Sequence, residues 1–485
     1  MSSIRLKDNN RLFWLSLWIL PLVIYVIFAF VDGVTWCADS NSYLEMHDCR
    51  EPLYPVLLAL FRTIFRIGND ADPRSNISLN AVVMIQSVLA AVATSSLAVY
   101  LFKTYIIKEK EERISLKDYL VAYILVSIPL MVSLLNRFAA GRSSMYSNSI
   151  MTEGLTISFY LLTFRYLLEY VNSESRYSCI MSGLLVLLGI ATRKQMYVLL
   201  CLLAIAIFYV VIIKKLTAEH EGSKSSILTK GLLRLLATIV LIVGIVLFFD
   251  CSYNKVVRGV FAPHTEDNRF VSTMAFYTAE RSYSEYIDPE LRDIYLKIYD
   301  ECDANGWLMH DAPDTWNEAV NHFSDNYDLI QLNTMQIMLE DYVDEADFSG
   351  FREGMTKTEK IDAVRSSFNS SLIRHEKGRI FHVFLNNLLC GLVDTVARRS
   401  KVLCIYSILI YLVFIVFALM TRRETMILSV MTVLGILGNV TLVSAVIFCQ
   451  TRYTIYNMPI FYMTMVIMIY SYLNNRCKRG TMDHV

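Results

Sequence analysis

Long runs of apolar residues recur along the chain and are separated by short polar segments. A helix needs about 20 apolar residues to cross a hydrocarbon core roughly 30 Å thick, and most of these runs approach that length. The pattern therefore predicts an all-α polytopic membrane protein with about ten transmembrane helices. The runs are Leu12–Phe30, Ala81–Phe102, Leu120–Leu135, Leu155–Val171, Cys179–Ala191, Tyr197–Ile213, Leu232–Phe249, Val402–Met420, Met426–Phe448 and Met458–Tyr472.

Composition agrees with this interpretation. The 485 residues are 55% hydrophobic and only 19% charged, whereas about a quarter of the residues in a soluble domain are charged. Leu12–Phe30 is too long for the apolar core of a signal peptide, and many further runs follow it. We therefore expect it to be a retained first transmembrane helix.

Lysine and arginine gather in alternate connections, which predicts the orientation of the chain. Because short basic loops face the cytoplasm, both termini are expected there, and the remaining connections are expected outside. The basic segments are Arg5–Arg11, 103–117, 214–230, Arg422–Arg423 and Arg476–Arg479. The expected external segments are 35–78, 136–152, 193–194, 250–401 and 449–457.

This topology predicts three parts: an N-terminal seven-helix module over 1–250 that includes the first external loop 35–78, an extracytoplasmic loop over 251–400, and a three-helix module over 401–485. Residues 251–377 hold 24 acidic and 12 basic residues. Stretches such as Pro289–Cys302 and Trp316–Leu339 have helical patterns. We expect this loop to form a small, ordered, mainly helical cap, with juxtamembrane helices beside it.

The segment 379–397 has an apolar stripe on one side of a predicted helix. His382, Asn386, Asn387 and Asp394 lie on the opposite side. A one-sided stripe is typical of a helix that lies in the membrane interface. We expect 379–397 to lie there, outside the cytoplasm. If it crossed the membrane, the segments that follow it would change sides.

Under this orientation, acidic and basic residues from separate external connections meet at the outer face. A carboxylate can act as a general base toward a hydroxyl, while arginine and lysine can hold an anionic phosphate. Because the cations lie at helix ends beside the lipid, the anion is expected to belong to a membrane-embedded molecule. The pattern favours transfer of a group from a lipid phosphate carrier. The residues are the acids Asp39 and Glu153, the cations Arg50, Arg193, Lys194 and Arg452, and the tyrosines Tyr43, Tyr54 and Tyr453.

Each of these residues also has an ordinary structural interpretation. Asp39 could cap the helix that follows the first span, and Glu153 could satisfy the positive N-terminus of the fourth transmembrane helix. Arg193 and Lys194 could extend from a helix end toward the headgroups, and Arg452–Tyr453 could anchor the chain at the interface. The sequence leaves both interpretations open.

At the same residues the chain resembles the GT-C superfamily of membrane glycosyltransferases, which includes protein O-mannosyltransferases and lipid A aminoarabinose transferases. The resemblance covers roughly residues 1–260 and the final two helices. Two positions depart from the family pattern, because Asp39 is followed by Ser40 rather than a second acid and Arg193 by Lys194 rather than proline. The matching segments are Asp39 with Tyr43, Arg50–Pro55 leading into Val56–Phe65, Thr152–Leu155, Arg193, and Arg452–Pro459.

The resemblance implies a GT-C-like fold and an inverting transfer from a polyprenyl-phosphate-linked sugar to an acceptor hydroxyl. It implies that Asp39 is the general base and that Glu153 orients the substrate or helps to bind a divalent metal ion. The other residues are expected to bind substrate: Tyr43, Arg50, Tyr54, Arg193, Lys194, Arg452 and Tyr453. No cofactor is certain, the acceptor is a glycan, lipid or protein, and no nucleic acid partner is expected.

Two other functions use the same lipid-linked substrates. A transporter or flippase would carry ionisable residues near the bilayer midplane, where this chain has almost none. A polysaccharide polymerase or ligase is a closer alternative, because it takes the same carrier. We expect a cell-envelope glycosylation enzyme in the bacterial cytoplasmic membrane with its site facing outward. An endoplasmic reticulum location is the alternative.

Overall fold

The computed structural model describes residues 9–66, 76–107, 114–139, 144–214, 224–264, 268–346, 348–397 and 400–482. Within these ranges the regular secondary structure is helical, apart from one isolated bridge between Thr35 and Ser149. The predicted all-helical class is confirmed. The chain packs into two units. Unit 1 comprises Met1–Ala262, Thr395–Gly438 and Ile455–Val485, and unit 2 comprises Pro263–Asp394 and Asn439–Thr454.

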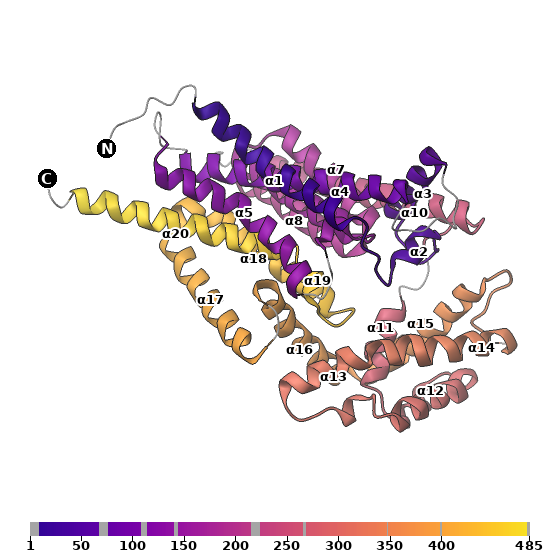
Figure 1. Cartoon of the computed structure of the whole chain (residues 1–485). Helices are drawn as coiled ribbons and strands as arrows, with labels where there is room; N and C mark the ends of the chain where they lie inside the picture. The colour runs from indigo at the N-terminus through magenta and orange to yellow at the C-terminus, as the bar shows by residue number, and fades with distance from the viewer. Residues whose placement is uncertain are drawn as a thin grey trace. The chain divides into compact units, whose positions relative to one another are not determined.

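Seven helical segments in the described ranges are long and apolar enough to cross a membrane, which supports a membrane-embedded protein. They coincide largely with α1 (Asn9–Asp32), α4 (Ile77–Leu101), α5 (Leu116–Ala139), α8 (Tyr197–Phe208), α10 (Lys224–Val257), α17 (Lys401–Met420) and α18 (Arg422–Ser444) (Figure 1). Large apolar side chains on α10 and α17 are exposed along much of both helices. These two helices therefore offer surfaces suited to lipid.

The other three predicted runs also form helices, namely α6 (Glu153–Ser173), α7 (Arg176–Thr192) and α20 (Asn457–Met482). α7 is short, and α6 and α20 interleave polar residues with apolar ones. Most of α6 is buried inside unit 1, and so is the first half of α20. A helix surrounded by protein need not be apolar on every side, which explains how α6 carries the Arg165–Glu169 ion pair. The count of ten crossings stays a prediction.

Unit 1 is built on α4, which packs against α1 and α6, while α6 packs against α7. Near the start of α6 the contact with α4 is very close. A Cβ atom on Gly154 would lie 2.5 Å from Nε2 of Gln86, a residue of α4. A larger residue at position 154 would force the Gln86 amide to move where these two helices meet. The predicted juxtamembrane helix after the first span is α3 (Leu53–Phe65).

Unit 2 has its own apolar core, which includes Phe276, Tyr295 and Phe368. The patterns at Pro289–Cys302 and Trp316–Leu339 correctly predict helical structure. The unit contains α11 (Asn268–Tyr277), α12 (Arg292–Ala304), α13 (Trp316–Asp328), α14 (Ile337–Glu345), α15 (Lys357–His375) and most of α16 (Lys377–Val396) (Figure 1).

α16 contains the segment predicted to lie in the membrane interface. Phe381, Leu385 and Leu389 are exposed on one side, whereas Val383 and Asn387 are buried on the other. The one-sided pattern is therefore present, and its position in a membrane stays a prediction. The boundaries expected at 250 and 400 also refer to a membrane and stay predictions. By packing, the boundaries after α10 and within α16 fall at Ala262 and Asp394.

Candidate functional site

Two loops of unit 1, one after α1 and one before α6, are held together by their backbones. The Thr35 amide donates to Asn148 O at 2.9 Å, and the Ile150 amide donates to Thr35 O at 3.0 Å. The Ser40 hydroxyl adds a third link to Ile150 O at 2.9 Å. These bonds fix the start of α2 (Ser40–Leu44) beside the segment that leads into α6.

Gln86 of α4 connects the start of α3, which carries Tyr54, to the loop before α6 by hydrogen bonds. Its Nε2 donates to the carbonyls of Ser147 and Ser149 at 2.8 and 3.1 Å, and its Oε1 accepts from the Tyr54 hydroxyl at 2.9 Å. Tyr54, expected to bind substrate, is fully buried in this network. Its ring meets the Tyr43 ring edge-on, with centroids 5.2 Å apart.

Asp39 precedes α2 and makes no capping hydrogen bond to it. Its Oδ1 instead accepts from Arg50 Nη2 at 2.9 Å, and both side chains are partly exposed. The Arg50 Nε donates to the Ser42 hydroxyl at 2.9 Å, and its guanidinium lies 4.6 Å from the centre of the Tyr43 ring. Arg50 thus holds the Asp39 carboxylate by charge, while Ser42 and Tyr43 fix the arginine.

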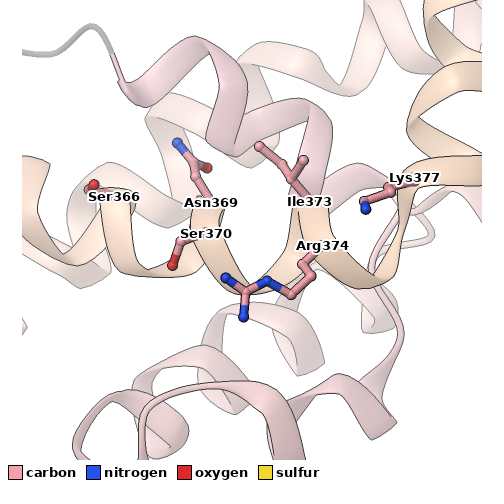
Figure 2. A pocket seen from close by; sticks show the side chains of 6 residues that line it. All are labelled: Ser366, Asn369, Ser370, Ile373, Arg374 and Lys377. Atoms are coloured by element: carbon pink, nitrogen blue, oxygen red, sulfur yellow. The ribbon is translucent and has the colours of Figure 1, made fainter.

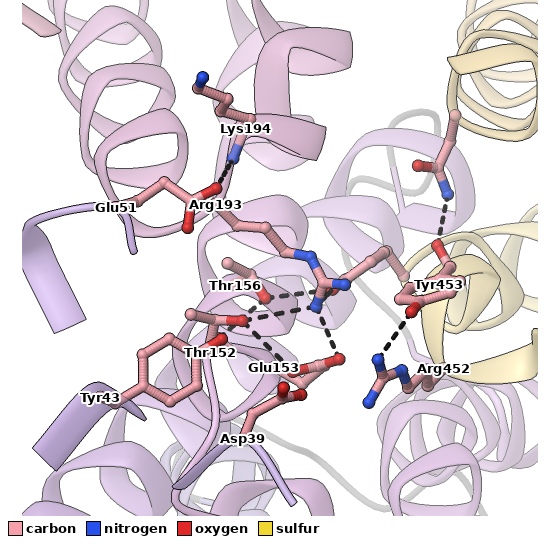
Figure 3. Close-up of polar contacts among 12 residues, drawn as sticks. Asp39, Tyr43, Glu51, Thr152, Glu153, Thr156, Arg193, Lys194, Arg452 and Tyr453 are labelled. Carbon is pink, nitrogen blue, oxygen red and sulfur yellow. Dashed lines mark hydrogen bonds and ion pairs between the residues drawn. The ribbon is translucent and has the colours of Figure 1, made fainter. Parts of the chain in front are cut away.

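Glu153 is the first residue of α6 and is almost completely buried. Its Oε1 lies 2.6 Å from Nη1 of Arg193, which stands in extended backbone between α7 and the 3-10 turn that begins at Lys194. The same nitrogen is 3.4 Å from the Thr152 and Tyr456 hydroxyls. Figure 3 shows this group around the Arg193 guanidinium. Arg193 is partly exposed and Glu153 is buried, so this guanidinium is held by a carboxylate inside the protein as well as reaching solvent.

Tyr43 connects the two ion pairs electrostatically. Burial raises the pKa of its hydroxyl above the usual range, and the charges of Arg50, Asp39, Glu153 and Arg193 all act on it. The hydroxyl therefore stays protonated at neutral pH. The Arg50 guanidinium lies over this ring, and Figure 3 draws the ring in the same group of side chains as Asp39, Glu153 and Arg193. Unit 1 thus brings together the predicted site residues Asp39, Glu153 and Arg193, and Tyr456 of the segment Arg452–Pro459 joins them.

Lys194, Arg452 and Tyr453 have other surroundings. The Lys194 amide, rather than its side chain, bonds to Glu51 Oε1 at 2.9 Å (Figure 3). Arg452 and Tyr453 belong to unit 2, where Arg452 Nη2 donates to the Tyr453 hydroxyl at 2.6 Å. Asn439 Nδ2 also donates to the Tyr453 carbonyl, at 2.9 Å. That Arg452 acts together with Asp39 stays a prediction.

In the described parts of the chain, one group of three His, Cys, Asp or Glu residues has ligand atoms close enough together for a metal ion. It consists of the exposed side chains of Asp303, His310 and Asp311 in unit 2. Asp39 and Glu153 are not members of such a group, and each pairs with an arginine. The donor set around them does not by itself build a metal site.

Sequence reasoning missed the residues that hold the site in shape, above all Gln86, Glu51 and Tyr456. Gln86 interrupts an apolar transmembrane run, where an amide is costly unless it is hydrogen-bonded. The presence of a glutamine in this apolar run could therefore have indicated that Gln86 makes hydrogen bonds to other segments. Glu51 and Tyr456 carry no such signal, because both lie in polar connections where such residues are common.

Comparison of the chain with known protein families, with characterised proteins and with solved structures found no match. The chemical interpretation of the site therefore rests on its residues and their geometry. Two carboxylates, two guanidinium groups and a protonated tyrosine hydroxyl come from three loops of one unit. This set combines a group that can accept a proton with groups that can stabilise an anion.

Proposed function

We propose that the protein is a membrane glycosyltransferase that moves a sugar from a polyprenyl-phosphate carrier to an acceptor hydroxyl on the extracytoplasmic side. One observation carries the proposal: within unit 1 the Asp39–Arg50 pair lies beside α2, and Ser40 of α2 is hydrogen-bonded to the segment that leads into Glu153 and its partner Arg193. Each acid is thus held beside an arginine, near the ends of helices that are apolar enough to cross a membrane. The resemblance to GT-C enzymes in the same residues supports this function.

In the proposed reaction, Asp39 removes the proton from the acceptor hydroxyl as its oxygen attacks the anomeric carbon. A new carbon–oxygen bond forms on the face opposite the leaving group, so the configuration inverts. The bond between the anomeric carbon and the phosphate oxygen breaks, and the polyprenyl phosphate leaves with the bonding electrons. Arg50 keeps the Asp39 carboxylate in a single orientation for this step.

Arg193 is proposed to stabilise the negative charge that develops on the phosphate. A guanidinium offers five N–H donors in a rigid plane, so one carboxylate partner does not exhaust it. Glu153 is proposed to position Arg193 and not to react itself, because it is buried against that side chain. Lys194 and Arg452 are proposed as further phosphate ligands. No step of this reaction is routed through a metal ion.

The test is Asp39→Asn in the full-length protein, assayed with a polyprenyl-phosphate sugar and a membrane extract that supplies acceptors. Loss of the base should lower the transfer rate by about 10² to 10⁴. The control is Asp300→Asn in unit 2, which removes an exposed carboxylate paired with Arg281 and should leave transfer unchanged. Full activity in a well-folded Asp39→Asn protein would remove the proposed base.

The same assay separates the alternatives. A flippase would move the lipid-linked sugar across vesicles without cleaving the sugar–phosphate bond, so no free polyprenyl phosphate would appear. A polymerase or ligase would release the carrier only when another saccharide is the acceptor. Release of polyprenyl phosphate that depends on Asp39 and on acceptor would support transfer, and the product identifies the acceptor class.

A further inference from the structure

Unit 2 contains a small cavity of about 200 Å³, and none of the candidate site residues lines it. Ligand pockets for drug-sized molecules measure about 300 to 1,000 Å³, so this cavity suits a smaller molecule. It is formed where α11, the segment 309–314, α13 and α16 meet. The side of α16 that lines it carries His382, Val383, Asn386 and Asn387. This is the polar side of the helix, which the proposed transfer reaction leaves without a role.

An unsatisfied amide lies in the wall of this cavity. Asn387 is only 2% exposed, and its Nδ2 has no hydrogen-bond partner. A buried N–H donor without an acceptor is costly, and native proteins contain few of them. A ligand oxygen in the cavity would satisfy this group.

Tyr277, which also lines the cavity, carries a group of the complementary kind. His322 Nε2 lies 3.0 Å from the Gly306 carbonyl, which can only accept, so this nitrogen carries the hydrogen. In the neutral ring Nδ1 is then an acceptor, and the Tyr277 hydroxyl donates to it at 3.1 Å. Burial raises the pKa of Tyr277, which keeps the proton on its oxygen. The oxygen therefore offers its lone pairs to a ligand.

The rest of the lining indicates which class of ligand fits. Phe323, Val320 and Val383 are buried and supply an apolar wall, and no lysine or arginine is among the residues that line the cavity. A single carboxylate, that of exposed Asp314, contributes a full charge. Such a site disfavours phosphate. It matches a neutral molecule with hydroxyl groups that both donate and accept, and with an apolar C–H face.

A second hollow in unit 2 differs from this cavity. It measures about 430 Å³ and runs along α15, with Arg374 and Lys377 at one end (Figure 2). Ser370 and Arg374 lie beside each other there (Figure 2). Both cations are exposed, so this surface is an ordinary solvated helix face.

We propose that the cavity between α13 and α16 binds one neutral monosaccharide unit. The Asn387 amide donates to a sugar hydroxyl, Tyr277 accepts from another, and the apolar wall packs against the C–H face of the ring. This function goes beyond the proposed transfer, because binding here needs neither the Asp39 carboxylate nor a lipid phosphate.

The test measures binding of methyl glycosides of glucose, mannose, galactose and N-acetylglucosamine to the full-length protein by saturation-transfer NMR. The protein is held in lipid nanodiscs, since maltoside detergents carry sugar themselves. At least one glycoside should bind saturably, and Asn387→Leu should weaken it by roughly tenfold. The control is Asn333→Leu, which alters an exposed asparagine that does not line the cavity and should leave affinity unchanged.

A second variant and a thermal measurement keep the result interpretable. Ala319→Leu adds volume to the cavity wall and should abolish binding. The unliganded Asn387→Leu protein should unfold at the same or a higher temperature, because the change removes an unsatisfied donor. Absence of saturable binding by every glycoside, equal affinity in wild-type and Asn387→Leu proteins, or displacement by inorganic phosphate would overturn the proposal. Asp39→Asn should keep full glycoside binding, which separates this proposal from glycosyl transfer.

Discussion

At the scale of single residues, the most informative feature is that the candidate acids are paired. Asp39 and Glu153 each contact an arginine from a different stretch of chain. The first pair is partly exposed and the second is largely buried, so solvent screens them to different extents. The exposed pair is therefore suited to exchange a proton with substrate, whereas the buried pair is suited to hold a geometry.

This difference predicts coupled stability effects for Glu153 and Arg193. Glu153→Gln should destabilise unit 1 by about 3 kcal/mol, because it leaves the Arg193 charge buried without its partner. Adding Arg193→Gln should recover part of this loss, with a coupling energy of roughly 1 to 3 kcal/mol. Thermal unfolding of the single and double variants in detergent measures the coupling.

The matched control is the exposed pair Lys357–Asp344 in unit 2, whose side chains are 46% and 59% exposed. Because water screens this pair, Asp344→Asn should leave the unfolding temperature essentially unchanged. Strictly additive effects of Glu153→Gln and Arg193→Gln would contradict the positioning role of Glu153.

At the scale of helices, the close contact of α4 with α6 determines whether the site forms. Gly154 lets Gln86 approach α6, and Gln86 in turn holds the carbonyls of Ser147 and Ser149. The packing of two helices and the shape of a loop are thus linked through one amide. A larger side chain at position 154 would therefore disturb the packing of α4 against α6 and the hydrogen bonds of Gln86 to the loop before α6.

We predict that Gly154→Ala lowers stability by about 1 to 3 kcal/mol, because the new methyl group overlaps the Gln86 side chain. In a Gln86→Ala background the same change should cost much less, because the overlapping atoms are gone. Gly183→Ala in α7 is the control, since its nearest neighbour would be 3.9 Å away and alanine favours a helix. Thermal unfolding of all four proteins tests this, and an equal loss in both backgrounds would refute it.

At the scale of the whole molecule, the number of membrane crossings depends on α6 and α7. Both have lengths that can span a bilayer, although neither is among the seven segments that are both long and apolar enough, and α7 is the shorter of the two. Because α6 is buried among other helices, its polar residues do not argue against a crossing. If both helices cross, the orientation predicted from the basic loops places the short connection between them in the cytoplasm.

Cysteine labelling tests this topology. We predict that Ser173→Cys, at the end of α6, and Lys117→Cys, at the start of α5, react with an impermeant maleimide only after the membrane is permeabilised. Ser282→Cys, exposed in unit 2, should react in intact cells. The wild-type protein sets the background from its own cysteines. Labelling of Ser173→Cys but not of Lys117→Cys in intact cells would show that α6 does not cross as predicted.

Much of the secondary structure follows directly from the sequence. All ten apolar runs and the patterns at Pro289–Cys302 and Trp316–Leu339 form helices, because apolar periodicity and length depend on local residue order. The selection of Asp39, Glu153 and Arg193 also needed only the sequence, since charges at the ends of apolar runs are conspicuous.

Tertiary structure alone decided which of these groups meet. That Arg50 pairs with Asp39 and Arg193 with Glu153, or that Gln86 closes the loops around Tyr54, depends on contacts between residues far apart in the chain. The sequence also could not show that the Asn387 amide lacks a hydrogen-bond partner, because burial of a side chain depends on the packing of the whole unit. Local sequence determines the helices, whereas the free energy of an ion pair or a cavity depends on the surroundings that the fold provides.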